Sequence, residues 1–321
     1  MKDRKDLAMH IVILDGGSTN PGDVSWAPLR ALGSVTVYDS TKPEEIVERA
    51  KNAEAVILNR NVISREIMQK LPKLRFIGLL ATGYNTVDVK AAGELGITVC
   101  NVPLYCVETV AQQAFALLLE LCNHTEKISA ATRGGDWDKA ETMSHSTHPL
   151  FELYGKTLGI GHIGQTVAKL GAALGMKILV YSRTKRELPE RYQWAELDAL
   201  FKNADVVSLH CPLTDETRGL VNAERLNLMK PTAFLINTAR GAVVDEAALA
   251  EALNSGRIAG AGLDVLVHEP PKKDDPLLTA QNCIVTPHIA WASRDARARL
   301  IKTVAENLKA FRNGTPQNVV S

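Results

Sequence analysis

The run Gly159-Ile160-Gly161-His162-Ile163-Gly164 carries the most information about the architecture of this chain. It has the pattern G-x-G-x-x-G, opens an alanine-rich helical pattern over 165–174, and leads to an apolar strand at Lys177–Tyr181. This spacing is typical of a βαβ unit that binds a dinucleotide, because glycines let the backbone turn sharply and approach a pyrophosphate at the positive end of the helix. Taken alone, the run also fits a tight structural turn, so its interpretation depends on the rest of the chain.

Length and composition restrict the class of protein. The chain has 321 residues, which favours two domains over a single core, and its 45% hydrophobic and 23% charged residues are typical of a globular protein. A net charge of +1 gives no reason to expect a nucleic-acid or membrane partner. Five scattered cysteines predict a reducing compartment and no metal site. With a polar start that does not resemble a signal peptide, and no apolar run of membrane-spanning length, we expect a cytoplasmic protein.

Short apolar strands alternate with amphipathic helical stretches along most of the chain. This rhythm predicts two doubly wound parallel sheets in an α/β fold, because parallel strands need crossover helices. A final helix at about 293–313 has no strand after it, so we expect it to return to the first domain. We therefore predict a discontinuous, flavodoxin-like substrate domain of residues 1–103 plus 291–321, and a Rossmann cofactor domain of residues 104–290.

Three segments after the glycine run carry side chains suited to catalysis. Asn237-Thr238-Ala239-Arg240-Gly241 ends a strand, where the planar guanidinium of Arg240 can grip a carboxylate. Asp264 and Glu269 follow the next strand, and His288 follows a third. A carboxylate beside a histidine stabilises the imidazolium, and such a pair suits proton transfer near neutral pH. The alternatives are a surface arginine, solvated acids and a structural histidine.

The stretch from Gly155 to Trp291 resembles the D-isomer-specific 2-hydroxyacid dehydrogenase family, and most closely its glycerate dehydrogenase (hydroxypyruvate reductase) branch. The resemblance implies hydride transfer between NAD(P)H and a small 2-keto or D-2-hydroxy acid, with hydroxypyruvate or glyoxylate reduced to D-glycerate or glycolate. It also implies a homodimer. The matching motifs are Gly155–Leu158 with the glycine run, Leu209–Thr214, Asn237–Gly241, Gly262–Val265 with Glu269-Pro270, Pro287–Trp291 and, in the first half, Leu80–Asn85 with Val87-Asp88.

The resemblance also implies roles for individual residues. Arg240 would bind the carboxylate and carbonyl of the 2-keto acid, His288 would donate the proton, and Glu269 would hydrogen-bond His288 and keep it protonated. Positive charge at Arg240 and His288 would stabilise the negative charge that develops on the substrate oxygen. The residues expected to hold the substrate are Thr82, Gly83, Arg240 and Trp291.

The cofactor site implied by the resemblance surrounds the glycine run, with Asp264 at the nicotinamide end. The residues expected to contact the cofactor are Gly159, Gly161, His162, Ile163, Gly164, Ser182, Arg183, Thr184, Cys211, Pro212, Thr217, Thr238, Ala239, Asp264 and His288.

The ribose position of this site is basic. Ser182 stands where the acid that reads the ribose belongs, and the segment 182–186 contains three cations and no carboxylate. An acid there would repel a 2′-phosphate, whereas arginine can pair with one. The sequence therefore favours NADP(H). NAD(H) stays possible if the segment is only an exposed basic loop.

The strand before the glycine run departs from the family pattern. The family usually has Gly-Lys-Thr-Leu-Gly-Ile-Ile before its G-x-G-x-x-G, whereas here Gly155–Leu158 meets Gly159 directly. The strand would then be about three residues shorter than usual. Either Leu153 and Tyr154 complete it, or the chain lacks residues that the natural protein has. We expect this chain to have weakened cofactor affinity.

One long helix is expected at about 108–133, and its part from Ala114 to Leu121 is apolar nearly all round. Such a surface suits burial between domains or subunits. Two further interpretations of the whole chain stay open. One keeps the fold with another 2-hydroxy acid as substrate, such as phosphoglycerate or formate. The other is a non-catalytic nucleotide-sensing protein, which the presence of Arg240, Glu269 and His288 disfavours.

Overall fold

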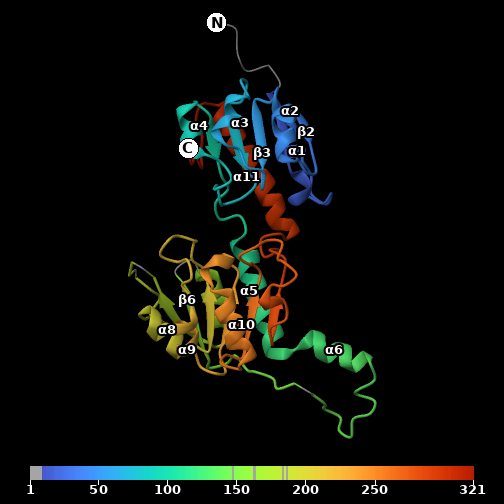
Figure 1. The fold of residues 1–321 in the computed structure, drawn as a ribbon, viewed down its shortest axis with the longest axis vertical. Coiled ribbons are helices and arrows are strands. Elements are labelled where there is room, and N and C mark those ends of the chain that lie inside the picture. The colour runs from blue at the N-terminus through green and yellow to red at the C-terminus, as the bar shows by residue number, and fades with distance from the viewer. Residues whose placement is uncertain (1–8, 147, 162–163, 183, 186) are drawn as a thin grey trace. The chain divides into compact units, whose positions relative to one another are not determined.

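The chain folds into two compact α/β units (Figure 1). The computed structural model describes residues 9–146, 148–161, 164–182, 184–185 and 187–321. Unit 1 comprises the chain up to Cys106 together with Trp291–Ser321, and unit 2 comprises Val107–Ala290. From the sequence we predicted that the first domain boundary lies between residues 103 and 104, whereas in the structure it lies between Cys106 and Val107. The second boundary, between residues 290 and 291, is the same in the prediction and the structure. Both units are doubly wound parallel sheets with helices, as the sequence predicts.

Unit 1 is built on a five-stranded sheet of order β2-β1-β3-β4-β5, with every neighbouring pair parallel. This is the flavodoxin-like order. Alternate residues of the central strands enter two different cores, because helices cover both faces of the sheet. The elements of unit 1 are β1 (Met9–Ile13), a 3-10 turn (Gly16–Ser18), α1 (Ala27–Arg30), β2 (Gly33–Val37), a 3-10 turn (Pro43–Glu45), α2 (Ile46–Ala50), β3 (Ala55–Leu58), α3 (Arg65–Gln69), β4 (Phe76–Leu79), α4 (Val89–Glu94), β5 (Thr98–Cys100) and α11 (Arg294–Arg312).

The last helix, α11, packs in unit 1 as predicted. It begins after Ser293, whose side chain accepts a hydrogen bond from the Ala296 amide, and ends at Asn313. Arg297 makes a two-pronged ion pair with Asp23, at 2.6 and 2.7 Å, which fixes the start of the helix to the loop after β1. The apolar face of the helix buries Leu300, Ile301, Val304 and Leu308.

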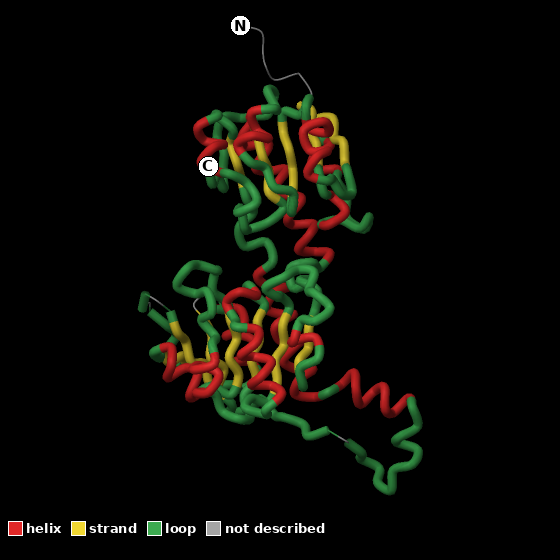
Figure 2. The backbone as a smooth tube through the Cα atoms, viewed as in Figure 1, coloured by secondary structure: helices red, strands yellow, loops and turns green. Residues whose placement is uncertain are grey.

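Unit 2 is built on a seven-stranded parallel sheet of order β12-β11-β10-β9-β6-β7-β8, whose strands lie side by side in Figure 2. Numbered within the unit, the first six strands follow the Rossmann order 3-2-1-4-5-6. The elements are α5 (Val107–Asn123), α6 (Thr125–Arg133), β6 (Thr157–Gly161), α7 (Gln165–Ala173), β7 (Lys177–Tyr181), β8 (Tyr192–Trp194), α8 (Leu197–Asn203), β9 (Val206–Leu209), α9 (Ala223–Leu228), β10 (Phe234–Asn237), a 3-10 turn (Gly241–Val243), α10 (Glu246–Asn254), β11 (Gly260–Leu263), a 3-10 turn (Pro276–Leu278) and β12 (Cys283–Val285).

The prediction of one helix over 108–133 is wrong, because the helix breaks at His124. His124 has a φ of +49° and separates α5 from α6. The apolar face of α5 ends at Cys122 and packs in the core of unit 2, against residues of β6, β10 and α7. The apolar run 114–121 is thus covered largely within its own unit. In contrast α6, all of which is described, buries none of its side chains and leads away from the rest of unit 2 (Figure 1).

The expectation of a shortened strand before the glycine run is also wrong. Strand β6 has five residues because Gly159–Gly161 form its second half, paired with Leu179–Tyr181 of β7. Leu153 and Tyr154 do not extend it: Gly155 has a φ of +73°, and the strand starts at Thr157. Gly159 pairs with both β7 and β9, and Gly161 pairs with Tyr181 of β7, so the first two glycines lie in the sheet. The shortening therefore falls on the connection between β6 and α7.

Candidate active site

Three neighbouring strands of unit 2, β10, β11 and β12, end at the same edge of the sheet. The carboxyl ends of parallel strands line the ligand crevice in this class of fold. Arg240 follows β10, Asp264 and Glu269 follow β11, and His288 follows β12. The order of the strands, rather than distance along the chain, brings these side chains to one edge.

His288 and Glu269 form a hydrogen-bonded pair. The distance between His288 Nδ1 and Glu269 Oε2 is 2.5 Å, and both side chains are about one-third exposed. The other carboxylate oxygen, Glu269 Oε1, accepts a hydrogen bond from the Leu266 amide at 3.2 Å, which orients the carboxylate. Because Nδ1 is engaged by Glu269, Nε2 is the ring nitrogen left to face a ligand. A carboxylate that holds the second nitrogen of a histidine fixes its tautomer and orientation for proton transfer.

The carboxylate of Asp264 organises the segment that carries His288. Asp264 is 1% exposed, and it accepts hydrogen bonds from the Thr286 hydroxyl at 2.6 Å and from the amides of Ile289 and Ala290 at 2.9 and 2.7 Å. The His288 amide donates to the Asp264 carbonyl at 2.9 Å, and His288 itself has a φ of +54°. Asp264 was predicted to contact the cofactor. In the structure its side chain holds the backbone that turns His288 towards Glu269.

Arg240 lies just past β10, in a turn fixed by a buried amide. Asn237 is 1% exposed, and its side chain donates to the Arg240 carbonyl and accepts from the Ala239 amide. The guanidinium of Arg240 is exposed and donates one hydrogen bond, to the Ala239 carbonyl at 2.7 Å. Gly241 permits this turn, because a Cβ there would lie 2.0 Å from the Leu266 carbonyl carbon.

Thr238 carries a buried hydroxyl at the same strand end. It is 9% exposed, and within the part of the chain that the structure describes its Oγ1 has no hydrogen-bond partner. A buried polar atom without a partner costs free energy, so a ligand that supplies one would bind favourably here.

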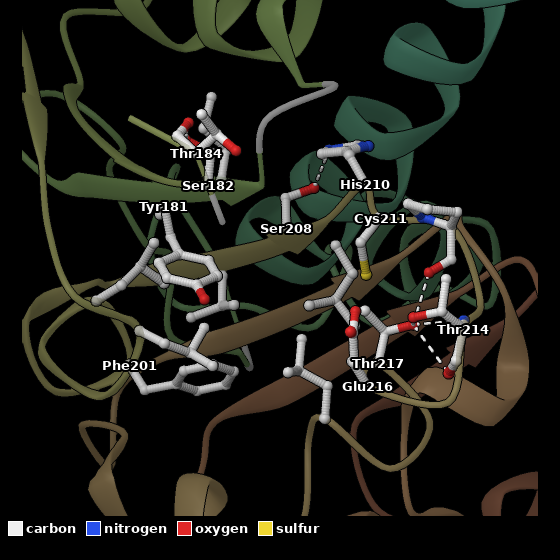
Figure 3. Close-up of a pocket in the computed structure, with 18 residues that line it drawn as sticks. Tyr181, Ser182, Thr184, Phe201, Ser208, His210, Cys211, Thr214, Glu216 and Thr217 are labelled. Carbon is white, nitrogen blue, oxygen red and sulfur yellow. Dashed lines mark hydrogen bonds between the residues drawn. The ribbon is translucent and has the colours of Figure 1, made fainter. Parts of the chain in front are cut away.

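A cavity of about 500 Å³ opens at the switch point of the sheet, between β6 and β9, where the strand order reverses (Figure 3). The carboxyl ends of β6, β7 and β9 and the helix α8 line it, together with the segment 211–217. The lining is mostly apolar, with a few hydroxyl groups near its edge, which suits a nucleoside. The predicted cofactor residues that line this cavity are Gly159, Ser182, Thr184, Cys211, Pro212 and Thr217.

The segment 211–217 is fixed by its own hydroxyl groups. Thr217 Oγ1 donates to the Pro212 carbonyl at 2.7 Å and accepts from the Thr214 amide at 2.7 Å (Figure 3). These local bonds hold one wall of the cavity in place.

A buried histidine, which the sequence analysis passed over, lies beside this wall. His210 is 9% exposed, and its Nε2 is 2.8 Å from the Ser208 hydroxyl (Figure 3). Burial lowers the pKa of His210 to about 4, so the ring is neutral at pH 7. The sequence signal was the alternation Ser208-x-His210 at the end of an apolar strand, which puts both side chains on one face of the sheet.

Other predicted residues lie elsewhere. Gly161 ends β6, Gly164 precedes α7, and Ala239 lies in the turn after β10. His162, Ile163 and Arg183 lie outside the described residues. Thr82, Gly83 and Trp291 belong to unit 1.

Within unit 1, Thr82 and Gly83 follow β4 at the carboxyl edge of that sheet. The Thr82 hydroxyl donates to the Val102 carbonyl at 2.8 Å, and the Asn101 side chain donates to the Thr82 carbonyl at 2.7 Å. These bonds fix the backbone whose amides are predicted to hold a carboxylate. Trp291 packs edge-on against Tyr105, with ring centroids 6.5 Å apart.

Open parallel sheets of this order, with a cavity at the switch point, define the nucleotide-binding class of α/β proteins. Comparison with known proteins narrows this class to one family. Residues 115–290 match the family model described as "D-isomer specific 2-hydroxyacid dehydrogenase, NAD binding domain". A hydroxypyruvate reductase from Blautia hydrogenotrophica is 46% identical over 321 residues, which cover 98% of this chain and 100% of that protein.

Two further proteins extend the comparison. A glycerate dehydrogenase from Methylorubrum extorquens is 41% identical over 289 residues, covering 88% of this chain and 90% of that protein. The solved structure of the acyclic imino acid reductase Bsp5 in complex with NADPH and D-Arg aligns with a TM-score of 0.84 at 31% identity, covering 98% of this chain and 100% of that one. The chain therefore belongs to the D-isomer specific 2-hydroxyacid dehydrogenase family of oxidoreductases. Within the described ranges, no helix is both long and apolar enough to cross a bilayer.

We expect Asp264→Asn to lower the free energy of unfolding by about 2 kcal/mol. The NH2 group of the asparagine cannot accept a hydrogen bond, so at least one group that now donates to the Asp264 carboxylate would be buried without a partner. Denaturant unfolding followed by circular dichroism measures the change. Asp274→Asn, at an exposed position of the same unit, is the control and should change little. Equal unfolding midpoints for the two variants would contradict the role given to Asp264.

The buried His210 predicts a loss of stability in mild acid. Its folded-state pKa lies near 4, below the unfolded value of about 6.5, so the unfolded chain binds a proton first as the pH falls. Stability should be complete above pH 6.5 and fall between pH 6.5 and 4, by roughly 3 kcal/mol in total from this group. Unfolding titrations across this range should show a shallower pH slope for His210→Gln. An unchanged slope would show that His210 does not titrate in this way.

Proposed function

We propose that this protein transfers a hydride between NAD(P)H and a small 2-keto acid, and that it reduces hydroxypyruvate or glyoxylate to D-glycerate or glycolate. The single observation that carries the proposal is the 2.5 Å pair of His288 and Glu269 at the strand edge that also presents Arg240. Reduction of a 2-keto acid requires a proton donor, which a carboxylate can orient. It also requires a group that binds the substrate carboxylate, for which a guanidinium is suited. The names of the relatives from Blautia and Methylorubrum support the substrate class.

A nicotinamide cofactor fits two features of the described residues. The apolar cavity at the switch point has the volume and edge hydroxyls for a nucleoside, and we assign Ser182, Thr184, Cys211, Pro212 and Thr217 to that end. The buried, unpartnered hydroxyl of Thr238 suits the polar carboxamide end, where we also place Ala239 and the Asp264 segment. When bound, the cofactor supplies or accepts the hydride at nicotinamide C4.

The chain's own residues would then bind and protonate the substrate. We assign the substrate carboxylate to the backbone amides of Thr82 and Gly83 and to the guanidinium of Arg240, which also binds the carbonyl oxygen. In the reduction direction, His288 donates a proton from Nε2 to that oxygen, and Glu269 keeps Nδ1 protonated and the ring oriented. Positive charge at Arg240 and His288 would stabilise the negative charge that develops on that oxygen. Trp291 is assigned to the wall of the substrate pocket.

We further propose that NADP(H) is preferred over NAD(H). Ser182 follows β7 at the ribose position, and its hydroxyl donates to the Thr184 carbonyl at 2.7 Å, so no carboxylate stands there to repel a 2′-phosphate. Lys185 Nζ lies 3.8 Å from the ring centroid of Trp194, which places a cation beside this segment. The complex of Bsp5 with NADPH supports the use of the phosphorylated cofactor on this fold.

We call residues 124–154 the arm, and we propose that it forms the contact of a homodimer. Its helix α6 buries none of its described side chains, and the segment after it exposes large apolar side chains. These are Trp137, Met143, Leu150 and Tyr154, which are 53%, 87%, 60% and 74% exposed. Apolar side chains gathered on a projecting segment are typical of a surface that a protein partner covers. Since the apolar run of α5 is covered within its own unit, the arm rather than that run is the proposed contact.

Replacing His288 by Ala should lower kcat for hydroxypyruvate by about 10² to 10⁴, the usual contribution of a positioned general acid. His268→Ala is the matched control, since His268 is an exposed histidine next to Glu269 in the same loop, and it should leave kcat within about twofold. Steady-state assays with hydroxypyruvate and glyoxylate, each with NADPH and NADH, measure both variants. Undiminished turnover by His288→Ala would refute the proton-donor assignment, and the lack of turnover by the unaltered protein with any of these pairs would refute the proposed function.

The arm predicts a particle of twice the 34.9 kDa of one chain in sedimentation equilibrium or light scattering. Changing Met143 and Leu150 together to Asp should shift the mass towards one chain, because burying a carboxylate in an apolar contact is costly. Leu278→Asp, at an exposed apolar site outside the arm, is the control and should leave the mass unchanged. A single-chain mass for the unaltered protein at micromolar concentration would contradict the dimer.

A further inference from the structure

The backbone between β11 and Glu269 is held by two carboxylates. The Leu266 amide donates to Glu269 Oε1 at 3.2 Å, and the next amide, that of Val267, donates to Glu246 Oε1 at 2.7 Å. The first bond orients the Glu269 carboxylate, and the second holds the backbone to which that carboxylate is bound. Glu246 is therefore connected, through one short stretch of chain, to the hydrogen-bonded pair of Glu269 and His288.

Glu246 is itself firmly placed, because it is the first residue of helix α10. The N-cap residue Asp245 accepts a hydrogen bond from the Ala248 amide at 3.1 Å through its side chain. The Asp245 amide donates to the carbonyl of the fully buried Val221 at 2.9 Å, which ties the start of the helix to the chain before α9. A carboxylate on such an anchored helix start can hold a loop amide in one place.

Gly241 lies against the same peptide unit, which joins Leu266 to Val267. A Cβ built on Gly241 would lie 2.0 Å from the Leu266 carbonyl carbon and 2.4 Å from the Val267 nitrogen, so only glycine permits this approach. Gly241 directly follows Arg240 in the chain. The turn that carries Arg240 and the loop that carries Glu269 thus meet at one peptide unit, and the Glu246 carboxylate fixes that unit.

The surroundings of Glu246 show what its side chain must supply. Burial raises the pKa of the Glu246 carboxyl, and the nearby carboxylates Asp275 and Asp245 raise it further, whereas the Val267 amide and His268 oppose the rise. A carboxyl group keeps an oxygen that can accept a hydrogen bond in both protonation states. The bond to Val267 therefore requires an acceptor oxygen at this place rather than a full negative charge, and a glutamine can provide one.

We propose, on the basis of the proposed function, that Glu246 is a positioning residue for the reduction of the 2-keto acid. It fixes the peptide between Leu266 and Val267, and so keeps the turn that carries Arg240 and the carboxylate of Glu269 in one frame. Glu246 acts through these residues and has no contact with the substrate. Its role matters because a small misplacement of catalytic groups lowers a rate steeply.

Three variants test this role in steady-state assays with hydroxypyruvate and whichever of NADPH and NADH the unaltered protein uses better. Glu246→Ala should lower kcat by about 10- to 100-fold, because the loop loses its tie. Glu246→Gln keeps an acceptor oxygen and should restore kcat to within about threefold of the unaltered protein. Glu251→Ala, the same change at an exposed position of the same helix, is the matched control and should leave kcat within about twofold.

The pH profile gives a readout that a general loss of stability would not move. A carboxylate stabilises the imidazolium beside it, so a loosened Glu269 should make kcat/KM for reduction fall at lower pH. We expect Glu246→Ala to move this alkaline limb downward by about half a pH unit or more, with Glu246→Gln following the unaltered profile. Amide hydrogen exchange in the segment 264–269 should also be faster in Glu246→Ala and unchanged in Glu246→Gln.

Cofactor affinity separates positioning from damage to unit 2 as a whole. The segment 264–269 is not among the described residues that line the cavity at the switch point. The dissociation constant of the cofactor, measured by fluorescence titration, should therefore stay within about threefold in all three variants. If Glu246→Ala does not fold, Glu246→Asp replaces it, since its carboxylate is one methylene too short for Val267. Glu246→Asp should then lower kcat and move the alkaline limb in the same direction.

The outcomes keep this inference distinct from the proposed function. If the unaltered protein turns over hydroxypyruvate and Glu246→Ala, or Glu246→Asp in its place, matches Glu251→Ala in kcat and pH profile, the function stands and the inference fails. The inference also fails if Glu246→Gln does not restore what Glu246→Ala loses, or if cofactor affinity falls along with kcat. If the unaltered protein turns over no 2-keto acid with either cofactor, the proposed function fails, and the inference fails with it.

Discussion

The buried carboxylate of Asp264 joins the ends of two neighbouring strands, and the geometry of the candidate site depends on it. Its oxygens accept hydrogen bonds from Thr286, Ile289 and Ala290, so the chain after β12 is drawn back to the end of β11. This contact holds His288 at a positive φ and directs its ring to Glu269. A buried carboxylate is tolerated only when such donors satisfy it, and the same donors make the turn rigid. The hydrogen-bonded pair of His288 and Glu269, which lies on two loops, is thereby positioned by a contact outside the pair.

The parallel sheet of unit 2 accounts for the rest of the arrangement. All its strands end at one edge, so side chains far apart in the sequence meet there, and the reversal of strand order between β6 and β9 leaves room for a cavity. On one side of this switch point the apolar cavity suits a nucleoside. On the other side β10, β11 and β12 present Arg240, Glu269 and His288. One sheet thus carries both the proposed cofactor site and the proposed acid–base pair, each at the place that strand order assigns to it.

Much of this could be predicted from the sequence, because apolar periodicity identifies strands and strand ends identify the site edge. The sheet class, the return of the last helix and the grouping of Arg240, Glu269 and His288 follow from such local signals. Other features could not be predicted, since local signals do not decide them. Pairing with β7 and β9 draws Gly159–Gly161 into the sheet, although their glycines suggest a turn. Helix α5 ends where its buried face ends, near Cys122, although the helical pattern continues. The three-residue edge strand β8 is too short to show alternation, and the roles of Asp264 and His210 depend on burial that only the folded chain defines.

Transfer of an isotope label from the cofactor to the product tests the proposed chemistry most directly. NADPH dideuterated at nicotinamide C4 would be incubated with hydroxypyruvate and the unaltered protein, and the product analysed by NMR and chiral chromatography. The proposed function predicts D-glycerate with a single deuterium at C2, because the deuteride would move directly from the cofactor to the substrate carbon. Glycerate without deuterium at C2, or a racemic product, would contradict this mechanism.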